Sequence, residues 1–321
     1  MSKCIKIWLI AAAALLWLGG IVFVGGMAAL HWDFTKLSTS KYETNEYTVT
    51  ETFGGLAFIA NTADIKLVPS ENGECKIVCY EQTNQKHTVA VRSGTLTVEV
   101  VDTRQWYEHI GINFGAPRIT VYMPAGAYGA LSVRSDTGNV DIPADFRFES
   151  MDIAESTGNV TSRASVAGAV RIGTTTGSIS LENVSAGEIE LSVTTGRVTA
   201  LGVSCAGDMK VNVSTGDAEL SDVSCRSLIS DGSTGDAVLR RVIAAERLSV
   251  TRSTGFIWLE ATDAAELCLK TDTGDVKGTL LSEKVFHAHS DTGYVNVPRT
   301  VTGGRCEITT DTGDIEITIA S

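Results

Sequence analysis

Proline and aromatic residues are scarce in this sequence of 321 residues, which contains 5 prolines and 7% aromatic residues. Glycine is abundant by contrast, with 31 occurrences. Many turn-forming residues and few large side chains are typical of an all-β protein with a thin core.

Basic residues are also in deficit, with 26 Lys and Arg against 38 Asp and Glu and a formal net charge of −12. Arg240–Arg241 is the only basic doublet in the second half of the chain, and no Lys/Arg stripe is present. Binding to phosphates needs a basic face, so the sequence argues against nucleic acid as a partner.

Motifs of the common enzyme classes are absent. The sequence has no P-loop, no glycine-rich dinucleotide fingerprint and no Ser-His-Asp grouping. The five histidines form no spacing typical of a metal site, and we interpret His287 and His289, two apart on one predicted strand, as an exposed pair. We predict no catalytic residues and a protein that is not an enzyme.

A Thr-Gly dipeptide returns at nearly constant spacing through the second part of the chain. Successive glycines of this set lie 19 or 20 residues apart. Ten in-phase copies indicate a repeat architecture. The glycines, each predicted to occupy a turn that needs a positive φ angle, are Gly138, Gly158, Gly177, Gly196, Gly216, Gly235, Gly255, Gly274, Gly293 and Gly313.

The residues on both sides of each glycine have the pattern of a β-strand. Apolar residues lie seven and five positions before the glycine and two and four after it, as with Leu131, Val133, Val140 and Ile142. A spacing of two buries one face of a strand, and two short strands can bury that face only by stacking on identical units.

We therefore predict an all-β fold, a single-stranded parallel β-solenoid of about ten coils over residues 126–321. At the spacing of stacked strands it would be roughly 45–50 Å long. A β-sandwich is the alternative, but it does not require near-identical turns at constant spacing.

Residues 34–125 lack the Thr-Gly period, and we predict an irregular β-rich region that leads into the stack and caps it. Turn signals at Ser70–Gly73 and Ser93–Gly94 separate its strands, and residues 102–117 are predicted to form a loop. The expected strands are Leu56–Ile59, Ile65–Val68, Cys75–Tyr80, Thr88–Val91, Leu96–Val101 and Ile119–Met123. At the far end of the chain, Ile315–Ile319 is expected to form an open edge where another chain can add.

An uncharged stretch of 24 residues, Ile7–Leu30, is long enough to cross a bilayer. A cleaved signal peptide is the rival interpretation, but its apolar region is usually shorter, about 7–15 residues. We predict an uncleaved anchor over residues 1–33, with Trp8 and Trp32 near the two interfaces. The protein is then single-pass in the cytoplasmic membrane, and the polar β-structure that follows favours a location outside the cytoplasm for most of the chain.

Several segments of the chain resemble a bacterial family of unknown function described as putative adhesins. They are Ala63–Leu67, the strand pair around Gly94–Val98, Ile119–Pro124, and repeats such as Leu131–Val133 before Asp136–Val140. The resemblance implies a membrane-tethered, non-enzymatic β-solenoid with a surface or stress-response role. The family has no agreed catalytic residues that could be transferred to this sequence.

Four of the turns read Asp-Thr-Gly, beginning at Asp136, Asp272, Asp291 and Asp311. In aspartic proteases this triplet supplies a pair of carboxylates. Here it is one variant of a turn also written Ser-Thr-Gly and Thr-Thr-Gly, and a catalytic pair needs two converging loops rather than a row.

The same acids form a candidate Ca²⁺ site. Asp272, Asp291 and Asp311 are expected in consecutive coils, with Asp275 and Asp314 three residues further on. Stacking would bring these carboxylates within roughly 5 Å of one another, and a hard cation would relieve their repulsion. Screening by water and salt is the simpler alternative.

Three aromatic residues form the candidate binding patch. Phe256 and Trp258 lie one and three residues after Gly255 and point outward in this register, and Tyr294 shares the Phe256 column two coils on. Exposed aromatic rings stack on sugars or anchor protein partners, although scattered apolar side chains are common on surfaces. The threonines sit at a bend and are assigned to local turn bonding rather than to an ice-binding face.

The seven cysteines give no clear disulfide framework. Cys75 and Cys79 would be roughly 13 Å apart on one extended strand, too far for a disulfide, and they lack the partners of a zinc site. Cys205 and Cys225 occupy equivalent places in adjacent coils, and a disulfide between them stays open. Cys306 is expected in the core and Cys268 on the surface.

These features together predict a membrane-anchored, surface-exposed β-solenoid without catalytic activity, acting in adhesion, envelope scaffolding or partner binding. Its expected partners are the membrane, through the N-terminal helix, and an envelope protein or glycan. A polysaccharide-active enzyme on the same scaffold is one alternative, although it needs an irregular groove with converging acids or bases. An accessory or sensor partner of a membrane stress-response system is the other.

Overall fold

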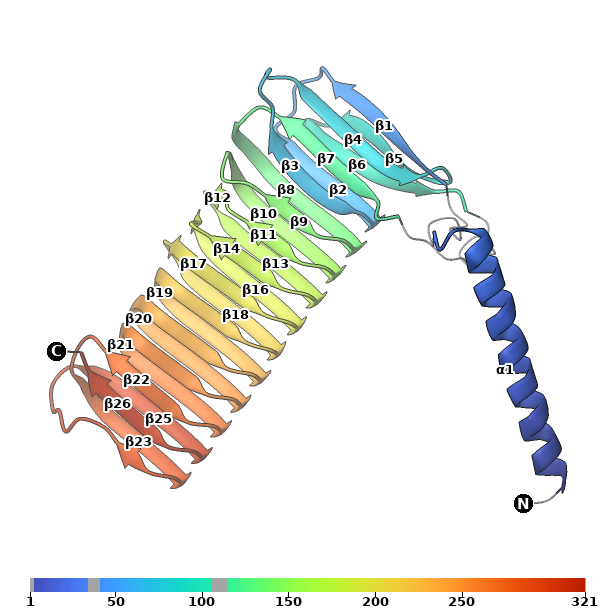
Figure 1. Ribbon diagram of the computed structural model, residues 1–321. Coiled ribbons are helices and arrows are strands. Elements are labelled where there is room, and N and C mark those ends of the chain that lie inside the picture. The colour runs from blue at the N-terminus through green and yellow to red at the C-terminus, as the bar shows by residue number, and fades with distance from the viewer. Residues whose placement is uncertain (1–2, 34–40, 105–114, 321) are drawn as a thin grey trace.

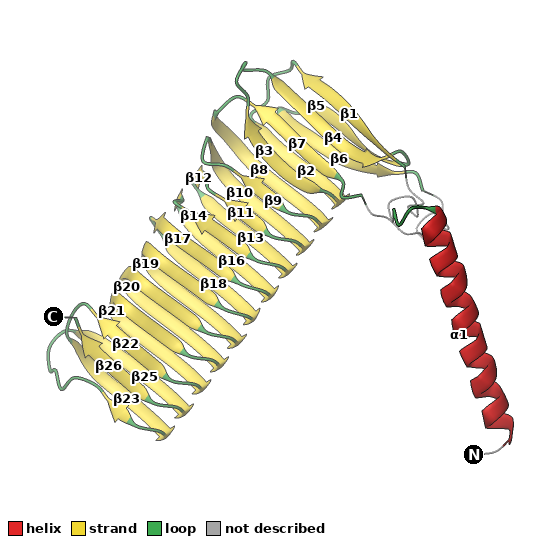
Figure 2. Ribbon diagram, viewed as in Figure 1, coloured by secondary structure: helices red, strands yellow, loops and turns green. Residues whose placement is uncertain are grey.

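The computed structural model describes residues 3–33, 41–104 and 115–320. It consists of one N-terminal helix and a long β-solenoid, as Figures 1 and 2 show. Helix α1 (Lys3–Ala29) contains Ile5–Ala29, the one stretch of helix in the described residues that is long and apolar enough to cross a membrane.

Strands make up most of the remaining described residues. In chain order they are β1 (Tyr42–Val49), β2 (Gly55–Thr62), β3 (Asp64–Pro69), β4 (Cys75–Gln82), β5 (Gln85–Arg92), β6 (Thr95–Asp102), β7 (Arg118–Met123), β8 (Gly126–Thr137), β9 (Val140–Ile142), β10 (Phe146–Thr157), β11 (Val160–Ser162), β12 (Ser165–Val166), β13 (Ala169–Thr176), β14 (Ile179–Glu182), β15 (Ser185–Ala186), β16 (Glu188–Thr195), β17 (Val198–Cys205), β18 (Asp208–Thr215), β19 (Ala218–Thr234), β20 (Ala237–Thr254), β21 (Ile257–Thr273), β22 (Val276–Leu280), β23 (Lys284–Thr292), β24 (Val295–Asn296), β25 (Gly304–Thr312) and β26 (Ile315–Ile319).

Each coil of the stack contributes one strand before its turn glycine and one after it. The strands before the glycine pair in parallel from coil to coil, and so do the strands after it. Equivalent residues align, with Met151 between Leu131 and Val170, and Thr157 between Thr137 and Thr176. The predicted parallel β-solenoid and its line of Thr-Gly corners are therefore confirmed.

The core is a narrow column of apolar side chains that runs the length of the stack. The alternating residues of each strand that point inward are buried, as are Val170, Ile172, Ile179 and Leu181 within one coil. Each layer covers the next, so burial depends on the neighbouring coil rather than on residues distant along the stack.

The corner glycines occupy a place that excludes side chains. All ten have positive φ angles, between 123° and 157°. A Cβ atom added at any of them would lie 1.6–2.1 Å from a backbone carbonyl oxygen of the adjacent corner. Both the backbone conformation and the close approach of the next coil therefore require glycine.

The N-terminal region differs from the leading coils that we expected. All six expected strands are present, as β2 to β7, but only β2, β3, β6 and β7 form coils parallel to the stack. Strand β4 is antiparallel to β7, β1 is antiparallel to β4, and β5 is antiparallel to β6. The cap, defined here as β1, β4 and β5 (blue and teal in Figure 1), thus extends each side of the solenoid with antiparallel strands. Strand β1 was not predicted, and most of the expected loop, 105–114, lies outside the described residues.

The prediction that Ile315–Ile319 forms the open edge at the C-terminal end is wrong. Strands β25 and β26 pair with β21 and β22 on one side and with β23 and β24 on the other. The last coil of the chain is thus inserted before the preceding one, and the outermost strands are β23 and β24 rather than Ile315–Ile319. Strand β2 is inserted in the same way between β6 and β8 at the other end.

Candidate functional site

Phe256 and Trp258 lie side by side on the outside of one coil. The side chains are 54% and 47% exposed, as expected from their outward register. Trp258 sits between Val238 and Lys277 in the adjacent coils. Together they border a shallow surface hollow of about 490 Å³, which we call the aromatic hollow; its lining includes Asp236, Val238, Arg240, Phe256, Trp258, Asp275 and Lys277.

Two aspartates of the aromatic hollow lie one residue after a turn glycine, and their carboxylates accept hydrogen bonds from the backbone of the adjacent coil. The backbone N–H of Phe256 donates to Asp236 Oδ1 at 2.8 Å. Asp275 Oδ1 accepts the N–H of Asp314 at 2.8 Å, and Asp275 Oδ2 lies 2.9 Å from Lys277 Nζ. The backbone hydrogen bond and Lys277 lower the pKa of Asp275. The hollow therefore presents two aromatic rings among fixed charges of both signs.

Tyr294 does not join this hollow. Because the last coil is inserted before the preceding one, the corners follow the order Gly255, Gly274, Gly313 and Gly293. Tyr294 is thus three coils from Phe256, not two, or roughly 14 Å along the stack. It is 65% exposed and stands alone near the distal end.

The three stacked aspartates of the candidate Ca²⁺ site, Asp272, Asp291 and Asp311, follow a different order along the solenoid from the expected one. Asp311 lies between Asp272 and Asp291, because β25 lies between β21 and β23. Asp272 Oδ1 is 3.7 Å from Lys270 Nζ, and Asp291 Oδ1 is 2.9 Å from His289 Nε2. Asp314 Oδ1 accepts the N–H of Tyr294 at 2.9 Å, much as Asp275 accepts that of Asp314. Asp272, Asp275, Asp291 and Asp314 already have partners within the protein, and a Ca²⁺ site in this row stays a prediction.

In most coils a polar side chain lines the inside of the corner, three residues before the glycine. Thr174, Thr271 and Thr310 donate through their hydroxyls to the carbonyl oxygens of Gly158, Gly255 and Gly274, at 3.0–3.3 Å. These bonds satisfy corner carbonyls that face the interior.

Glu155 takes the same inward place as Thr174 in the preceding coil. Its side chain is buried, and neither carboxyl oxygen has a hydrogen bond of normal geometry. Burial raises the pKa of Glu155 to about 7, against a smaller lowering by the Ser135 hydroxyl. The neutral acid is therefore the favoured form in the folded protein below neutral pH.

Arg252 is a second charged residue in this inward position. Its guanidinium donates to the backbone oxygen and the hydroxyl of Ser230, both at 3.0 Å, whereas Nε has no partner. Gly232 in the neighbouring coil leaves the space for it, since a Cβ there would lie 3.1 Å from Arg252 Nη1. Burial lowers the pKa of Arg252 from its usual range.

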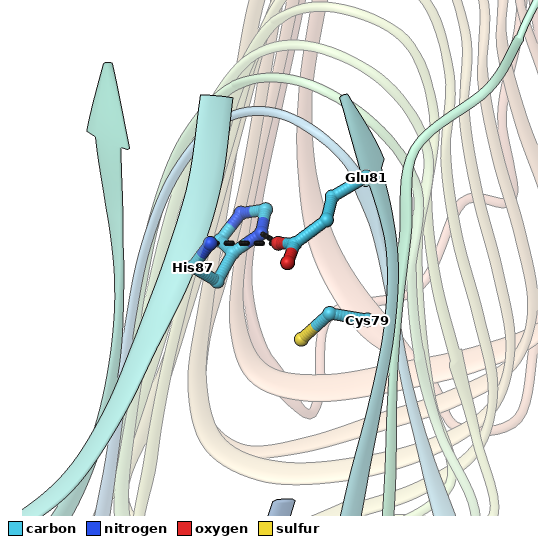
Figure 3. Close-up of side chains that lie close together, drawn as sticks. All are labelled: Cys79, Glu81 and His87. Carbon is cyan, nitrogen blue, oxygen red and sulfur yellow. Dashed lines mark hydrogen bonds and ion pairs between the residues drawn. The ribbon is translucent and has the colours of Figure 1, made fainter. Parts of the chain in front are cut away.

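The cap contains a third buried group, formed by Cys79, Glu81 and His87 (Figure 3). Cys79 and Glu81 are two residues apart on β4 and so point to the same side, while His87 comes from β5. Their exposed fractions are 0%, 0% and 4%. One ligand atom from each lies within 4.8 Å of the others, and no other such group of three His, Cys, Asp or Glu occurs in the residues that the structure describes.

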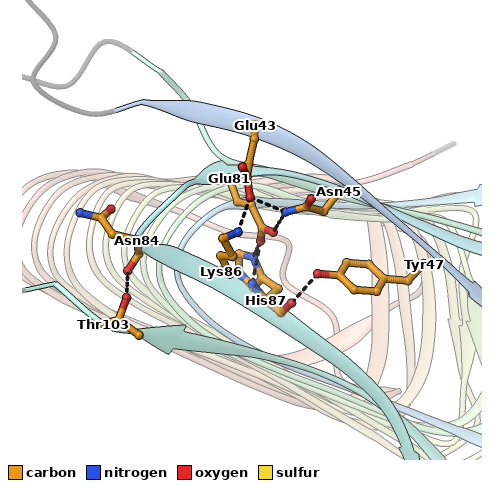
Figure 4. Close-up of polar contacts among 8 residues, drawn as sticks. All are labelled: Glu43, Asn45, Tyr47, Glu81, Asn84, Lys86, His87 and Thr103. Atoms are coloured by element: carbon orange, nitrogen blue, oxygen red, sulfur yellow. Dashed lines mark hydrogen bonds and ion pairs between the residues drawn. The ribbon is translucent and has the colours of Figure 1, made fainter.

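Hydrogen bonds orient Glu81 and His87 (Figure 4). Glu81 Oε2 accepts the backbone N–H of His87 and contacts His87 Nδ1, both at 2.6 Å, and Oε1 accepts the Asn45 amide at 2.7 Å. The Tyr47 hydroxyl donates to the His87 carbonyl oxygen at 2.9 Å. Burial, and then the charge of Glu81, raise the pKa of Cys79 to about 12.

The other cysteines whose side chains the structure describes are free thiols. Cys205 and Cys225 are buried in adjacent coils and form no disulfide, so the possibility that the sequence left open is not realised in this structure. Cys306 is buried in the core as expected, and Cys268 is partly exposed. His287 and His289 are exposed, as interpreted from the sequence.

The sequence interpretation missed three groups that the structure shows. Cys79 has potential metal-binding neighbours, although Cys-x-Glu followed by His six residues after the acid is not a recognised motif. Glu155 and Arg252 could have been noticed, because each stands at a place where other repeats have Thr, Ser, Val or Gly. The period of the repeat was the available signal.

Three solved structures that this chain matches come from bacteria. A putative adhesin from Parabacteroides distasonis has 12% identity and a TM-score of 0.50, over 85% of this chain and 98% of its own. A putative adhesin from Bacteroides fragilis has 15% identity and a TM-score of 0.42, over 87% and 97%. A putative lipid binding protein from Parabacteroides distasonis has 14% identity and a TM-score of 0.47, over 75% and 95%. The first of these supports the fold alone.

None of the curated proteins matches this sequence. A family model, by contrast, matches residues 56–217 and 202–321, which together span the whole solenoid apart from strand β1. The matched segments include the Thr-Gly corners and the strands β3, β6 and β7 from which the resemblance was drawn. On this evidence the chain belongs to the Toastrack DUF4097 family.

Proposed function

We propose that this protein is a non-catalytic binding module held at the outer side of the cytoplasmic membrane, and that the aromatic hollow binds an envelope glycan. The observation that carries the proposal is the pair of exposed rings, Phe256 and Trp258, beside a hollow with charged residues at its edge. Flat aromatic faces stack on sugar rings, and nearby charged and amide groups hydrogen-bond the hydroxyls.

The anchor and the family support the surface location. Helix α1 is long and apolar enough to span a bilayer, and a signal sequence would pass the same test. The similar structures include proteins described as putative adhesins, which fits a surface domain without catalytic activity. An uncleaved single-pass anchor is part of the proposal.

The acids of the hollow favour binding over catalysis. Asp236 and Asp275 belong to the repeating position after the glycine, where each accepts a backbone N–H from the next coil. The backbone N–H of Asp314, and then the ion pair with Lys277, lower the pKa of Asp275. A glycosidase needs one carboxyl with a raised pKa opposite a second carboxylate, whereas the pKa of Asp275 is shifted in the opposite direction.

The test is binding of the full chain, in detergent micelles, to purified cell-wall polysaccharide. We expect Trp258→Ala to weaken binding by about tenfold or more, as truncation of a central aromatic contact does. Tyr122→Ala is the matched control, because Tyr122 is an exposed aromatic on β7, at the cap end. It should bind as the unaltered protein does.

Equal binding by Trp258→Ala and the unaltered chain would refute the hollow as the site. Loss of binding in both variants would place the contact elsewhere. If polysaccharide does not bind at all, but a membrane protein is captured by the unaltered chain and not by Trp258→Ala, the partner is a protein and the glycan assignment is wrong.

A further inference from the structure

We propose that Cys79, Glu81 and His87 form a binding site for a divalent metal ion of the zinc class inside the cap. The site is separate from the aromatic hollow, and nothing in the proposed binding function requires it. The argument rests on the chemistry of the three side chains, their convergence, and the place where they converge.

The three residues offer the ligands that zinc prefers. A thiolate, an imidazole nitrogen and a carboxylate oxygen are the common protein ligands of Zn²⁺, and three of them with one open position are typical of sites that also bind water. Ca²⁺ and Mg²⁺ prefer all-oxygen sites, so the sulfur and nitrogen argue against them.

The distances are compatible with a tetrahedral ion. Bonds of about 2.0–2.3 Å to zinc place neighbouring ligand atoms roughly 3.3–3.6 Å apart. The three ligand atoms already lie within 4.8 Å of one another. Small rotations of the side chains would bring the ligand atoms to that spacing.

The surroundings are those of a prepared site. Asn45 donates to Glu81 Oε1 at 2.7 Å and fixes the carboxylate, as outer hydrogen bonds commonly do for metal ligands. Without an ion, His87 Nε2 is buried and has no hydrogen-bond partner, which is an unusual arrangement inside a protein. The hydrogen bonds of the cap therefore leave this imidazole incompletely satisfied.

The position of the group suggests what the ion would do. Strands β4 and β5 form a hairpin, but only Gln82 and Gln85 pair between them. Beyond that pair β4 enters the sheet with β1 and β7, and β5 enters the sheet with β6. An ion held by β4 and β5 would tie the two sheets together where they separate.

Binding of the metal ion releases protons from its ligands. Cys79 binds as the thiolate after its thiol loses a proton, and His87 binds through a ring nitrogen that carries no proton. Glu81 binds as the carboxylate. The ion thus replaces protons without any change of oxidation state.

The experiment is metal binding to the chelator-treated full chain in detergent micelles. We expect one equivalent of Zn²⁺ to bind and to raise the Tm, and Co²⁺ at the same site to give a near-ultraviolet thiolate-to-cobalt absorption band. Cys79→Ser should weaken Zn²⁺ binding by about 100-fold or more and abolish the band, since loss of a ligand exceeds the effect of an outer contact.

Two controls separate this site from others. Cys75→Ser removes a thiol from the same strand, and His289→Ala removes an exposed imidazole beside Asp291. Both should keep the cobalt band and the affinity. If Cys79→Ser does not fold, the unaltered chain still decides the matter: stoichiometric binding without a thiolate band, or no binding, would overturn the proposal.

Discussion

The glycine at each corner shows how a single residue type sets the shape of this molecule. Its φ angle is positive, and its α-carbon lies against the carbonyl oxygen of the adjacent corner. A side chain would have to displace a backbone atom that is itself part of the next turn. Glycine is therefore required at every corner, because the backbone of each corner leaves no room for a side chain on the corner stacked against it.

Gly158→Ala should destabilise the protein by about 2–4 kcal/mol, since the new Cβ would lie 1.6 Å from the Gly138 oxygen at a φ of 154°. Gly173→Ala is the matched control in the adjacent coil. Its Cβ would meet only one atom, at 3.9 Å, and its φ angle is not in the left-handed region, so the change should stay within about 1 kcal/mol. Urea unfolding of both variants measures the difference, and equal stabilities would show that the corners tolerate a side chain.

Glu155 makes stability depend on pH. Burial raises the pKa of its carboxyl from 4.5 to about 7 on folding. Between these pH values the folded chain binds more protons than the unfolded chain, so the free energy of unfolding falls as pH rises. The contribution should reach about 2–3 kcal/mol between pH 5 and pH 8.

Glu155→Gln removes the ionisable group and should remove this component, leaving the variant more stable than the unaltered protein at pH 8. Glu190→Gln, at an exposed acid, is the control and should keep the original pH dependence. Unfolding of the unaltered protein and both variants by urea at pH 5 and pH 8 gives the six values required. A Gln variant with unchanged pH dependence would mean that another group titrates.

At the scale of elements, both ends of the stack contain a coil that is inserted out of sequence order. The terminal coil in space is not the terminal coil in sequence, because β25 and β26 lie inside β23 and β24, and β2 and β3 lie inside β6 and β7. At the C-terminal end, the outermost coil (β23 and β24) is followed in the chain by the coil that lies inside it. At the other end, the outer coil (β6 and β7) is preceded in the chain by the coil that lies inside it. This arrangement ties the last strands to the stack at both ends, where a solenoid is otherwise prone to fray.

Removal of residues 304–321 should release more than the last coil. In the described part of the chain β23 pairs only with β25, and β24 only with β26. Without those partners we expect residues 284–296 to lose protection from amide hydrogen exchange, while β21 stays protected through β20.

Truncation after Ile319 is the control, since it leaves β25 and β26 intact and should preserve the protection of β23. If residues 284–296 remain protected in the longer truncation, β23 has moved to pair with β21. The insertion order would then be unimportant for its stability.

The whole molecule is a rod whose stability comes from contacts between adjacent coils. Many ion pairs also cross between coils, among them Arg134–Asp152, Arg226–Asp208 and Arg241–Asp222, but their side chains are about half exposed. Exposed pairs of this kind contribute little, so buried apolar columns and backbone hydrogen bonds hold the rod together. The aromatic hollow lies eight coils from β6 and β7, or roughly 40 Å along the stack. A rigid rod of that length would present the hollow well away from the capped end.

The repeat of Thr-Gly and the spacing of two in the flanking strands were sufficient to predict the solenoid, its corners and its inward columns. They were also sufficient to predict that Phe256 and Trp258 point outward, because the side of a strand follows from the register. The antiparallel cap was not predictable in the same way. Strand β1, for example, alternates only partly buried residues, and its pairing with β4 joins residues between 26 (Val49 and Cys75) and 40 (Tyr42 and Gln82) positions apart.

The sequence by itself determined the coil, because each coil obeys a local rule that its own residues carry: glycine at the corner and apolar side chains at alternate positions. The tertiary structure alone decided the order of the terminal coils, which separated Tyr294 from Phe256, and the meeting of Cys79, Glu81 and His87. The order of the terminal coils and the meeting of these three residues both depend on which strands pair at the ends of the sheet. The edge of a sheet can pair with any strand of suitable register. That choice is made by packing over the whole end of the stack and leaves no periodic signal in the chain.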